Sequence, residues 1–268
     1  MDKLRFQSFA SGSSGNCYFI GNAANGILID AGIGVRIIRK NLRSIGLGFE
    51  NIWGVFVTHD HADHIRAVGS LGEIHHVPVY ATKKVHEGIN NSYCVTEKLN
   101  SSRRYLEKNE SVQIGDFTIT SFPVSHDATD SVGYTVEYKD KRFTFATDLG
   151  YVCEDASRHL KMANYMVFEA NYDETMLLNG HYPEDLKKRI MSNTGHLSNI
   201  QAAKFLSENF QEHLKFVFLC HLSKENNHPE VALNTVKTIL KDKNINVGED
   251  IQLIILERFT PTEVFILN

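Results

Sequence analysis

Five metal-binding side chains stand within six residues of this chain, in the run His59-Asp60-His61-Ala62-Asp63-His64. The run follows Ile52–Val57, an apolar segment typical of a buried strand. A turn at the end of a strand can direct several of these side chains to one point. Imidazole and carboxylate together suit zinc, iron and manganese. We therefore expect a metal-binding turn here, with a solvated polar turn as the alternative.

The overall composition is that of a soluble globular protein. The chain has 268 residues, 42% of them hydrophobic and 22% charged. This length admits one large α/β domain or two halves around a shared interface, and we expect a single domain over residues 1–268. The net charge of −4 does not indicate a nucleic-acid binder, but bound metals and local basic clusters leave that function open.

Cysteine usage and hydropathy suggest the compartment. The four cysteines are scattered without a CxxC motif, which favours buried thiols over a disulfide framework. The segment Met1–Phe6 has no apolar core of signal-peptide length, and no apolar run approaches a membrane span. We expect a cytoplasmic enzyme.

Strands predominate early in the chain and helices late, which predicts two β-sheets packed face to face between helices, a four-layer αββα sandwich of the α/β class. A helix over Val35–Ile45 carries four cations on its polar face, where solvation and a ligand role both remain open. The predicted strands are Leu4–Phe9, Tyr18–Ile20, Ile27–Asp30, Ile52–Val57, Phe117–Phe122, a hairpin of Val132–Tyr138 with Arg142–Ala146, Tyr165–Glu169, Lys215–Leu219, Ile251–Leu256 and Glu263–Leu267. The later helices are predicted over Asp155–Met162, Glu174–Leu178, Pro183–Met191, Ser198–Asn209 and Pro229–Leu240.

Further polar residues end strands down the chain: His126, Asp148 and His221 each follow an apolar run. With the histidine run, their order resembles that of the metallo-β-lactamase fold superfamily over nearly the whole chain. The resemblance implies two divalent metal ions, and it implies a structural role for Asp30, which would brace the histidine turn. One ion would be held by His59, His61 and His126, the other by Asp63, His64 and His221, with Asp148 bridging them.

The donor spacing also has a physical rationale. Three neutral imidazoles leave a divalent ion open positions for water, and a carboxylate between two ions offsets their repulsion. A hydroxide between ions about 3.5–4 Å apart is a nucleophile at neutral pH, and such a pair of ions can stabilise a phosphoryl centre. Zinc, manganese and iron all suit these donors.

Two further motifs narrow the substrate class. Glu169-Ala170-Asn171 ends a predicted strand, and Gly195-His196-Leu197-Ser198 begins a helix. Both resemble paired motifs of tRNA 3′-processing endonucleases, in which a glutamate orients a histidine that protonates the leaving oxygen. The alternatives are a helix-cap neighbour for His196, and a surface or metal-supporting carboxylate for Glu169.

The motifs together are similar to one bacterial branch, the YycJ/WalJ-type metallohydrolases. The resemblance implies DNA exonuclease activity from 5′ ends and a link to a two-component system that governs cell-wall metabolism. The segments that carry it are Ala10–Asn16, Thr58–His64, Phe168–Asn171, Gly195–Asn199 and Cys220–Pro229.

Two loops offer candidate substrate contacts. Ser13, Ser14 and Asn16 lie in a glycine-rich loop that can form an anion-binding nest, or simply a tight turn between strands. Asn227 and His228 follow His221 in one loop and can touch substrate or orient His221. A helix that starts at Pro229 explains that loop without function.

The leading hypothesis is a dinuclear metal phosphodiesterase acting on nucleic acid, with DNA as the expected partner and 5′-to-3′ polarity taken from the resemblance. The expected catalytic residues are Asp63, His196 and Glu169: a metal-bridging hydroxide would attack phosphorus while Glu169 and His196 assist the leaving group. The alternatives are a small-molecule hydrolase of the same fold, acting on a cyclic phosphodiester, lactone or thioester, and a regulatory protein. The sequence leaves the native metal and the oligomeric state open.

Overall fold

The computed structural model describes residues 3–267, which divide into two compact units. The first unit holds the described residues up to Glu110, the segment Ala128–Ser131, and those from Glu257 onward. The second holds Ser111–Asp127 and Val132–Leu256. Each unit is built on one seven-stranded mixed sheet with helices, which confirms the predicted α/β class. The single domain stays a prediction.

The sheet of the first unit is antiparallel on one side and parallel on the other. β1, β2 and β3 form a meander beside β14, whereas β3 to β6 run parallel. In spatial order the strands are β14 (Phe265–Leu267), β1 (Leu4–Ala10), β2 (Cys17–Gly21), β3 (Gly26–Ile29), β4 (Ile52–Phe56), β5 (Val79–Ala81) and β6 (Arg103–Tyr105). Every residue of β2 and β3 is buried. Their near-continuous apolar sequences are typical of strands that are covered on both faces.

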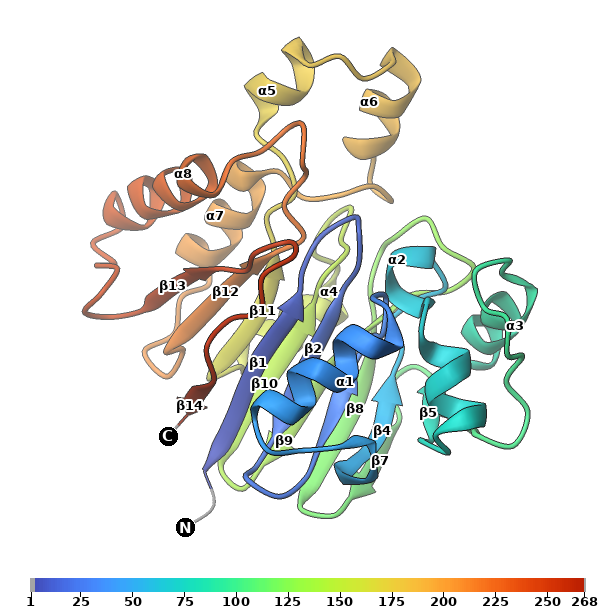
Figure 1. Cartoon of the computed structure of the whole chain (residues 1–268). Coiled ribbons are helices and arrows are strands. Elements are labelled where there is room, and N and C mark those ends of the chain that lie inside the picture. Colours follow the sequence, from blue (N-terminus) through green and yellow to red (C-terminus); the bar gives the residue numbers. More distant parts are fainter. Residues whose placement is uncertain (1–2, 268) are drawn as a thin grey trace. The chain divides into compact units, whose positions relative to one another are not determined.

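Helix α1 (Val35–Ser44) lies over the strands of this first sheet (Figure 1). Ile38 and Leu42, one turn apart, are buried in the core with Phe19 and Leu28. The other helical segments of the unit are the 3₁₀ turn η1 (Phe49–Asn51), α2 (Ala62–Ile65), the π-helical turn η2 (Ser70–Ile74) and α3 (Lys83–Asn91).

The second sheet repeats this mixed pattern. β7 to β10 are antiparallel neighbours, and β10 to β13 run parallel. In spatial order the strands are β13 (Gln252–Ile255), β12 (Phe216–Cys220), β11 (Tyr165–Glu169), β10 (Lys141–Ala146), β9 (Val132–Tyr138), β8 (Phe117–Pro123) and β7 (Ser111–Ile114). β8 and β10 therefore point the same way, because both are antiparallel to β9.

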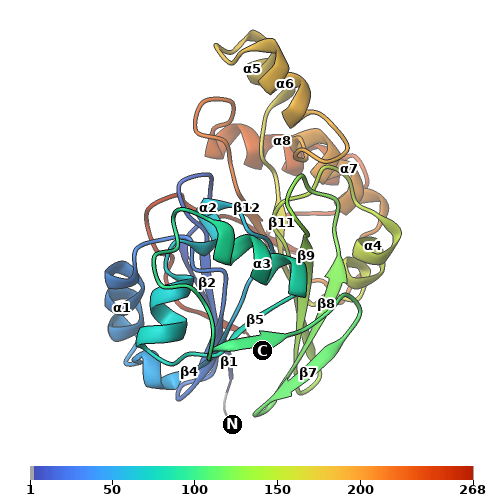
Figure 2. The ribbon, with the colours of Figure 1, turned by 90° about the vertical axis from the view of Figure 1, so that its right-hand side faces the viewer.

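Five helices belong to the second unit. α7 and α8 pack against each other (Figure 2), and they bury Ala202, Leu206, Val236 and Leu240 in the core of this unit. α4 packs against β8 and β10. The helices are α4 (Glu154–Lys161), α5 (Glu174–Asn179), α6 (Glu184–Ile190), α7 (Asn199–Glu208) and α8 (Pro229–Lys241).

Among the described residues, none of the four cysteines forms a disulfide, as predicted; Cys17 and Cys220 are buried and the other two partly buried. Over residues 3–267, every helix is too short or too polar to cross a lipid bilayer.

Candidate metal centre

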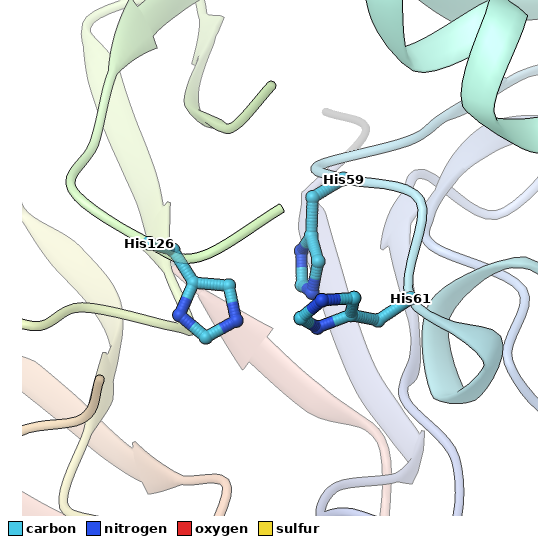
Figure 3. A group of neighbouring side chains, drawn as sticks. All are labelled: His59, His61 and His126. Atoms are coloured by element: carbon cyan, nitrogen blue, oxygen red, sulfur yellow. The ribbon is translucent and has the colours of Figure 1, made fainter. Parts of the chain in front are cut away.

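The histidine run leaves β4 as a tight turn and enters α2, with His61 at the N-cap position. The ring of His59 lies 4.7 Å from that of His61 and 4.0 Å from that of His64, between centroids. Figure 3 shows His59 and His61 on this turn and His126 on the segment that follows β8. A Cβ atom at Gly32 would stand 1.6 Å from the carbonyl oxygen of Asp63, so the neighbouring chain must be glycine at that point.

Asp30 holds this turn from the end of the adjacent parallel strand. Its Oδ1 accepts from the Thr58 N–H at 2.8 Å, and its Oδ2 accepts from the Thr58 hydroxyl at 2.8 Å. Oδ2 also lies 2.7 Å from His64 Nδ1. Because the carboxylate is an acceptor, Nδ1 of His64 carries the proton and Nε2 has the lone pair, which faces the Asn16 amide nitrogen at 2.9 Å.

The side chain of Asp30 is fully buried. Burial raises the pKa of the Asp30 carboxyl, although the attraction and hydrogen bond of His64 and the bonds from Thr58 act in the opposite direction. The interactions with His64 and Thr58 thus favour the ionised carboxylate, while its desolvation opposes it.

Asn16 in the glycine-rich loop is also buried, and its amide is engaged within the unit. Its Nδ2 lies 2.9 Å from His64 Nε2 and 3.3 Å from Asp63 Oδ2, and its Oδ1 accepts from the Gly12 N–H at 2.8 Å. These contacts favour the tight-turn alternative over the predicted phosphate contact for Asn16. Ser13 is exposed and Ser14 partly exposed, so both remain candidates for that contact.

Asp60, which the sequence left without a role, ties the turn to the segment Ala128–Ser131. Its carboxylate accepts from both the N–H and the hydroxyl of Thr129, while His59 forms a β-bridge with Ser131. Gly88 packs against it, since a Cβ there would stand 1.9 Å from Asp60 Oδ2. No pattern in the sequence identifies this partnership, because the two segments are about seventy residues apart.

In the second unit, four strands deliver polar residues to one edge of the sheet. β10, β11 and β12 are parallel neighbours and end near Asp148, at Glu169 and just before His221. β8 points the same way and ends before His126. Ligand sites in α/β sheets lie outside the carboxyl ends of parallel strands, and these residues occupy that position.

Asp148, Glu169, His196 and His221 form one cluster at this edge. Each offers a ligand atom, and these atoms all lie within 4.8 Å of one another. His221 Nδ1 lies 3.0 Å from both Asp148 Oδ1 and Glu169 Oε1, and His196 Nδ1 lies 2.7 Å from Glu169 Oε1. The predicted Glu169–His196 pair is thus brought together, beside two of the predicted ligands.

The buried carboxylate of Glu169 organises the cluster. Its Oε2 accepts from the N–H groups of Leu149 at 2.8 Å and Leu197 at 3.1 Å, which leaves Oε1 for the two imidazoles. Burial raises the pKa of Glu169, but attraction to His196 and hydrogen bonds from both histidines outweigh this and lower it below the ordinary value. Glu169 is therefore held ionised.

The loop that carries His196 also orients His126. The Gly195 carbonyl oxygen lies 3.0 Å from His126 Nδ1, so this nitrogen carries the proton and Nε2 presents its lone pair. His126 Nε2 lies 3.9 Å from Asp148 Oδ1. The role of Gly195 was not predicted, because a backbone carbonyl leaves no signature in a sequence.

Asn171 is a third residue whose role the sequence did not reveal. Its Nδ2 donates to the His221 carbonyl oxygen at 2.8 Å and supports the left-handed backbone of His221, whose φ is 55°. The residue belongs to the Glu-Ala-Asn motif, so its place in the chain was the available signal.

Asn227 and His228 act at helix starts. The buried Asn227 donates to the carbonyl oxygens of Ala170 and Asn171 at 2.9 and 3.0 Å, and it pairs with the amide of Asn199. His228 caps α8 by accepting from the Glu230 N–H at 3.3 Å. These contacts favour the helix-start alternative over the predicted substrate contacts.

The donors of each unit fit divalent metal ions. His64 and His126 each hold one ring nitrogen against an oxygen acceptor and present the other, which is the usual arrangement of histidines around bound metal. Carboxylates stand beside imidazoles in both units, a combination that zinc, manganese and iron accept.

Comparison with known proteins places this architecture. The model of the beta-lactamase superfamily domain matches residues 25–217. In the solved structures, the metallo-β-lactamase fold protein YhfI from Bacillus subtilis superposes with a TM-score of 0.69 at 15% identity, covering 98% of this chain and 99% of that one. Fold and donor set define a metal-dependent hydrolase of the metallo-β-lactamase fold.

Curated relatives identify the branch. Exodeoxyribonuclease YycJ of Bacillus anthracis is 32% identical over 97% of this chain and 98% of its own length. Exodeoxyribonuclease WalJ of Streptococcus pneumoniae D39 is 34% identical over 93% of each. This chain belongs to the YycJ/WalJ family of the beta-lactamase superfamily.

Proposed function

We propose that this protein is a metal-dependent phosphodiesterase that removes nucleotides from the 5′ ends of DNA. The observation that carries the proposal is the 2.7 Å contact between His196 and the buried Glu169, within a cluster of metal-binding side chains. Relatives named exodeoxyribonucleases, similar over nearly their whole length, support DNA as the substrate. With DNA as substrate, the proposal places the enzyme in the cytoplasm.

The proposal includes two divalent metal ions held at histidine and aspartate side chains. Bound there, the ions would supply a water molecule acidified near neutral pH and positive charge at the phosphoryl group. The carboxylate of Asp148 is the proposed bridge between them. The complete proposed set is His59, His61, Asp63, His64, His126, Asp148 and His221.

His196 is proposed as the acid that protonates the leaving 3′-oxygen. Its side chain is 20% exposed, whereas that of Glu169 is fully buried, so the imidazole can meet a substrate while the carboxylate cannot. Glu169 accepts at Nδ1 of His196, which directs Nε2 to the substrate as the proton donor. The transfer passes through the protonated imidazole, which donates from Nε2 while its Nδ1–H stays bonded to Glu169.

The test uses duplex DNA labelled at either the 5′ or the 3′ end. Wild-type protein is stripped of metal and supplied with manganese or zinc, beside His196→Gln and the matched control His181→Gln, which changes an exposed histidine. We expect metal-dependent, stepwise release of the 5′ label. His196→Gln should lower kcat by roughly 10²–10³-fold with little change in KM, and the control should match wild type.

Other outcomes would overturn parts of the proposal. Release from the 3′ label first would contradict the polarity. Turnover of bis(p-nitrophenyl) phosphate without cleavage of DNA would move the substrate to a small phosphodiester or to RNA. No metal-dependent hydrolysis of any phosphodiester would leave a regulatory protein as the better account.

A further inference from the structure

Helix α1 presents an uninterrupted stripe of positive charge. The side chains of Arg36, Arg39, Lys40 and Arg43 recur at helical spacing on the face opposite the buried Ile38 and Leu42, and the helix contains no acidic residue. Among the described residues, no carboxylate forms an ion pair with these four cations. The concentration of charge contrasts with the net charge of −4 for the whole chain.

The stripe ends at a cavity of about 640 Å³ where α1 gives way to β4. Arg39 and Arg43 line it, together with Phe49, Glu50, Ile74 and His75. Glu50 is the acid of this lining. Its carboxylate folds back against Gly48, where a Cβ would stand 2.3 Å from Glu50 Oε1, and among residues 3–267 no ion pair joins it to Arg39 or Arg43.

Arg39 is held in place at the cavity wall. Its guanidinium lies 5.2 Å from the centre of the Phe49 ring, and its Nη2 lies 3.1 Å from His75 Nε2. The rings of Phe49 and His75 are themselves 4.5 Å apart. Burial, followed by the charge of Arg39, lowers the pKa of His75, so the imidazole is neutral and accepts the bond. A guanidinium fixed in this way loses little freedom when it binds a phosphate.

The stripe leads away from the histidine turn within the first unit. β3 and β4 are parallel, and α1 returns from the end of β3 to the start of β4. The cavity residues Glu50 and Asn51 precede β4, whereas His59 follows it. The eight residues from Asn51 to His59 span about 25 Å if extended, which equals roughly seven nucleotide steps of DNA.

We propose that the α1 stripe and its cavity bind the phosphate backbone of the DNA substrate, several nucleotides from the end being hydrolysed. This inference rests on the proposed function. From Arg36 to Arg43 the helix rises about 10 Å, enough to follow three phosphates of one strand. Substrates shorter than about eight base pairs do not reach the cavity and gain nothing from it.

Fluorescence anisotropy measures the binding of labelled duplexes without metal, over a range of salt concentrations. The duplexes have about 6 and about 20 base pairs, which are shorter and longer than the roughly seven nucleotide steps between the histidine turn and the cavity. Two variants remove pairs of charges from the stripe, Arg39→Gln/Arg43→Gln and Arg36→Gln/Lys40→Gln. Lys241→Gln/Lys243→Gln removes the same charge from the end of α8 as the control. Hydrolysis of bis(p-nitrophenyl) phosphate reports on the metal centre of each variant.

For the long duplex, each stripe variant should bind on the order of tenfold more weakly, and the slope of log K against log salt should shrink by about 1.8. The short duplex, the control variant and the small phosphodiester should show no change. An unchanged slope in variants of a protein that cleaves DNA would overturn this inference and leave the proposed function standing. If the stripe variants bound inorganic phosphate more weakly but the long duplex as tightly as wild type does, the stripe would be a small-anion site. That result would also overturn this inference. A wild-type protein that neither binds nor cleaves DNA would overturn both.

Discussion

Two residues at the candidate centre have the left-handed backbone conformation, which residues other than glycine rarely adopt. Asp30, with φ of 58°, directly follows β3, and His221, with φ of 55°, directly follows β12. Such conformations persist where surrounding contacts enforce them. Here Thr58 and His64 hold Asp30, and Asn171 holds His221.

The brace at Asp30 can be tested by substitution. Asp30→Ala leaves the Thr58 N–H and hydroxyl and His64 Nδ1 without their acceptor, and it should lower the free energy of unfolding by about 3 kcal/mol. Asp30→Asn tolerates the left-handed backbone and keeps one acceptor, so its loss should be smaller. Urea unfolding of the metal-free protein measures both. The exposed Asp116→Asn serves as control, and an Asp30→Ala protein as stable as this control would contradict the brace.

The roles of individual residues could be predicted from the sequence where residue type and spacing both indicate the same chemistry. They could not be predicted where the role depends on a tertiary contact. The Glu169–His196 contact could be predicted from two motifs. The Asn171 bond to His221 could not, because nothing in the spacing shows which backbone group an amide will meet. Asn16 and Asn227 resemble substrate contacts in the sequence, yet both amides are buried and engaged within the protein.

Among the elements, the starts of α7 and α8 are joined beneath the cluster of the second unit. Ser198 and Gln201 form a capping box on α7, and the paired amides of Asn199 and Asn227 connect α7 to the loop before α8. Asn227 also bonds the chain that follows β11. One side chain therefore links three elements.

Asn227→Ala should destabilise the protein by about 2 kcal/mol, because the Ala170 carbonyl and the buried Asn199 amide lose this partner, whereas the Asn171 carbonyl keeps the Ser223 N–H. Its KM for DNA should stay near the wild-type value. Urea unfolding and steady-state kinetics separate the two effects. Normal stability with a raised KM would instead favour the substrate contact that the sequence suggested.

α4 carries a pH-sensitive contact with the second sheet. His159 stacks on Phe122, with centroids 4.4 Å apart, and its Nδ1 lies 2.9 Å from the Thr135 hydroxyl. Burial, followed by the charge of Arg158, lowers its pKa from the ordinary 6.5, so the folded protein binds this proton less readily than the unfolded chain. The contribution of His159 to the free energy of unfolding is therefore fully present above pH 6.5, the ordinary pKa. It is lost as the pH falls through the lower pKa that His159 has in the folded protein.

The midpoint of urea unfolding, followed from pH 7.5 to 5, measures this effect. Stability should fall with decreasing pH in wild type and fall less steeply in His159→Asn, which cannot take up the proton. This pH range brackets the ordinary pKa of 6.5. If stability fell equally steeply with pH in the two proteins, His159 would be ruled out as a source of the pH dependence.

Most elements could be predicted because their apolar patterns are strong, and the misses have local causes. Helix α1 and the hairpin of β9 and β10 lie within a residue or two of their predicted positions. β5, β6 and α3, in the segment after α2, were not predicted. β5 and β6 have three residues each, too few for a visible period, and two consecutive lysines begin α3.

At the scale of the whole molecule, the same device serves each unit. A mixed sheet places its parallel strands so that their carboxyl ends carry the polar residues, Asp30 and the histidine turn in one unit and the Asp148 cluster in the other. The sequence predicted two sheets because strands predominate early, helices late, and both halves carry each. The order of strands could not be predicted, since pairing joins segments such as β1 and β14 from opposite ends of the chain.

Hydrolysis by this protein should depend on metal ions held by the proposed histidine and aspartate ligands. The most direct measurement is the metal content per chain, by mass spectrometry, alongside DNA hydrolysis, for wild type and Asp148→Ala after stripping and reconstitution with manganese or zinc. We expect about two ions per wild-type chain, fewer in Asp148→Ala, and loss of activity of at least about 10²-fold in the variant, which lacks the proposed bridge. Hydrolysis of DNA that survives complete removal of metal, or an Asp148→Ala protein with full metal content and full activity, would contradict it.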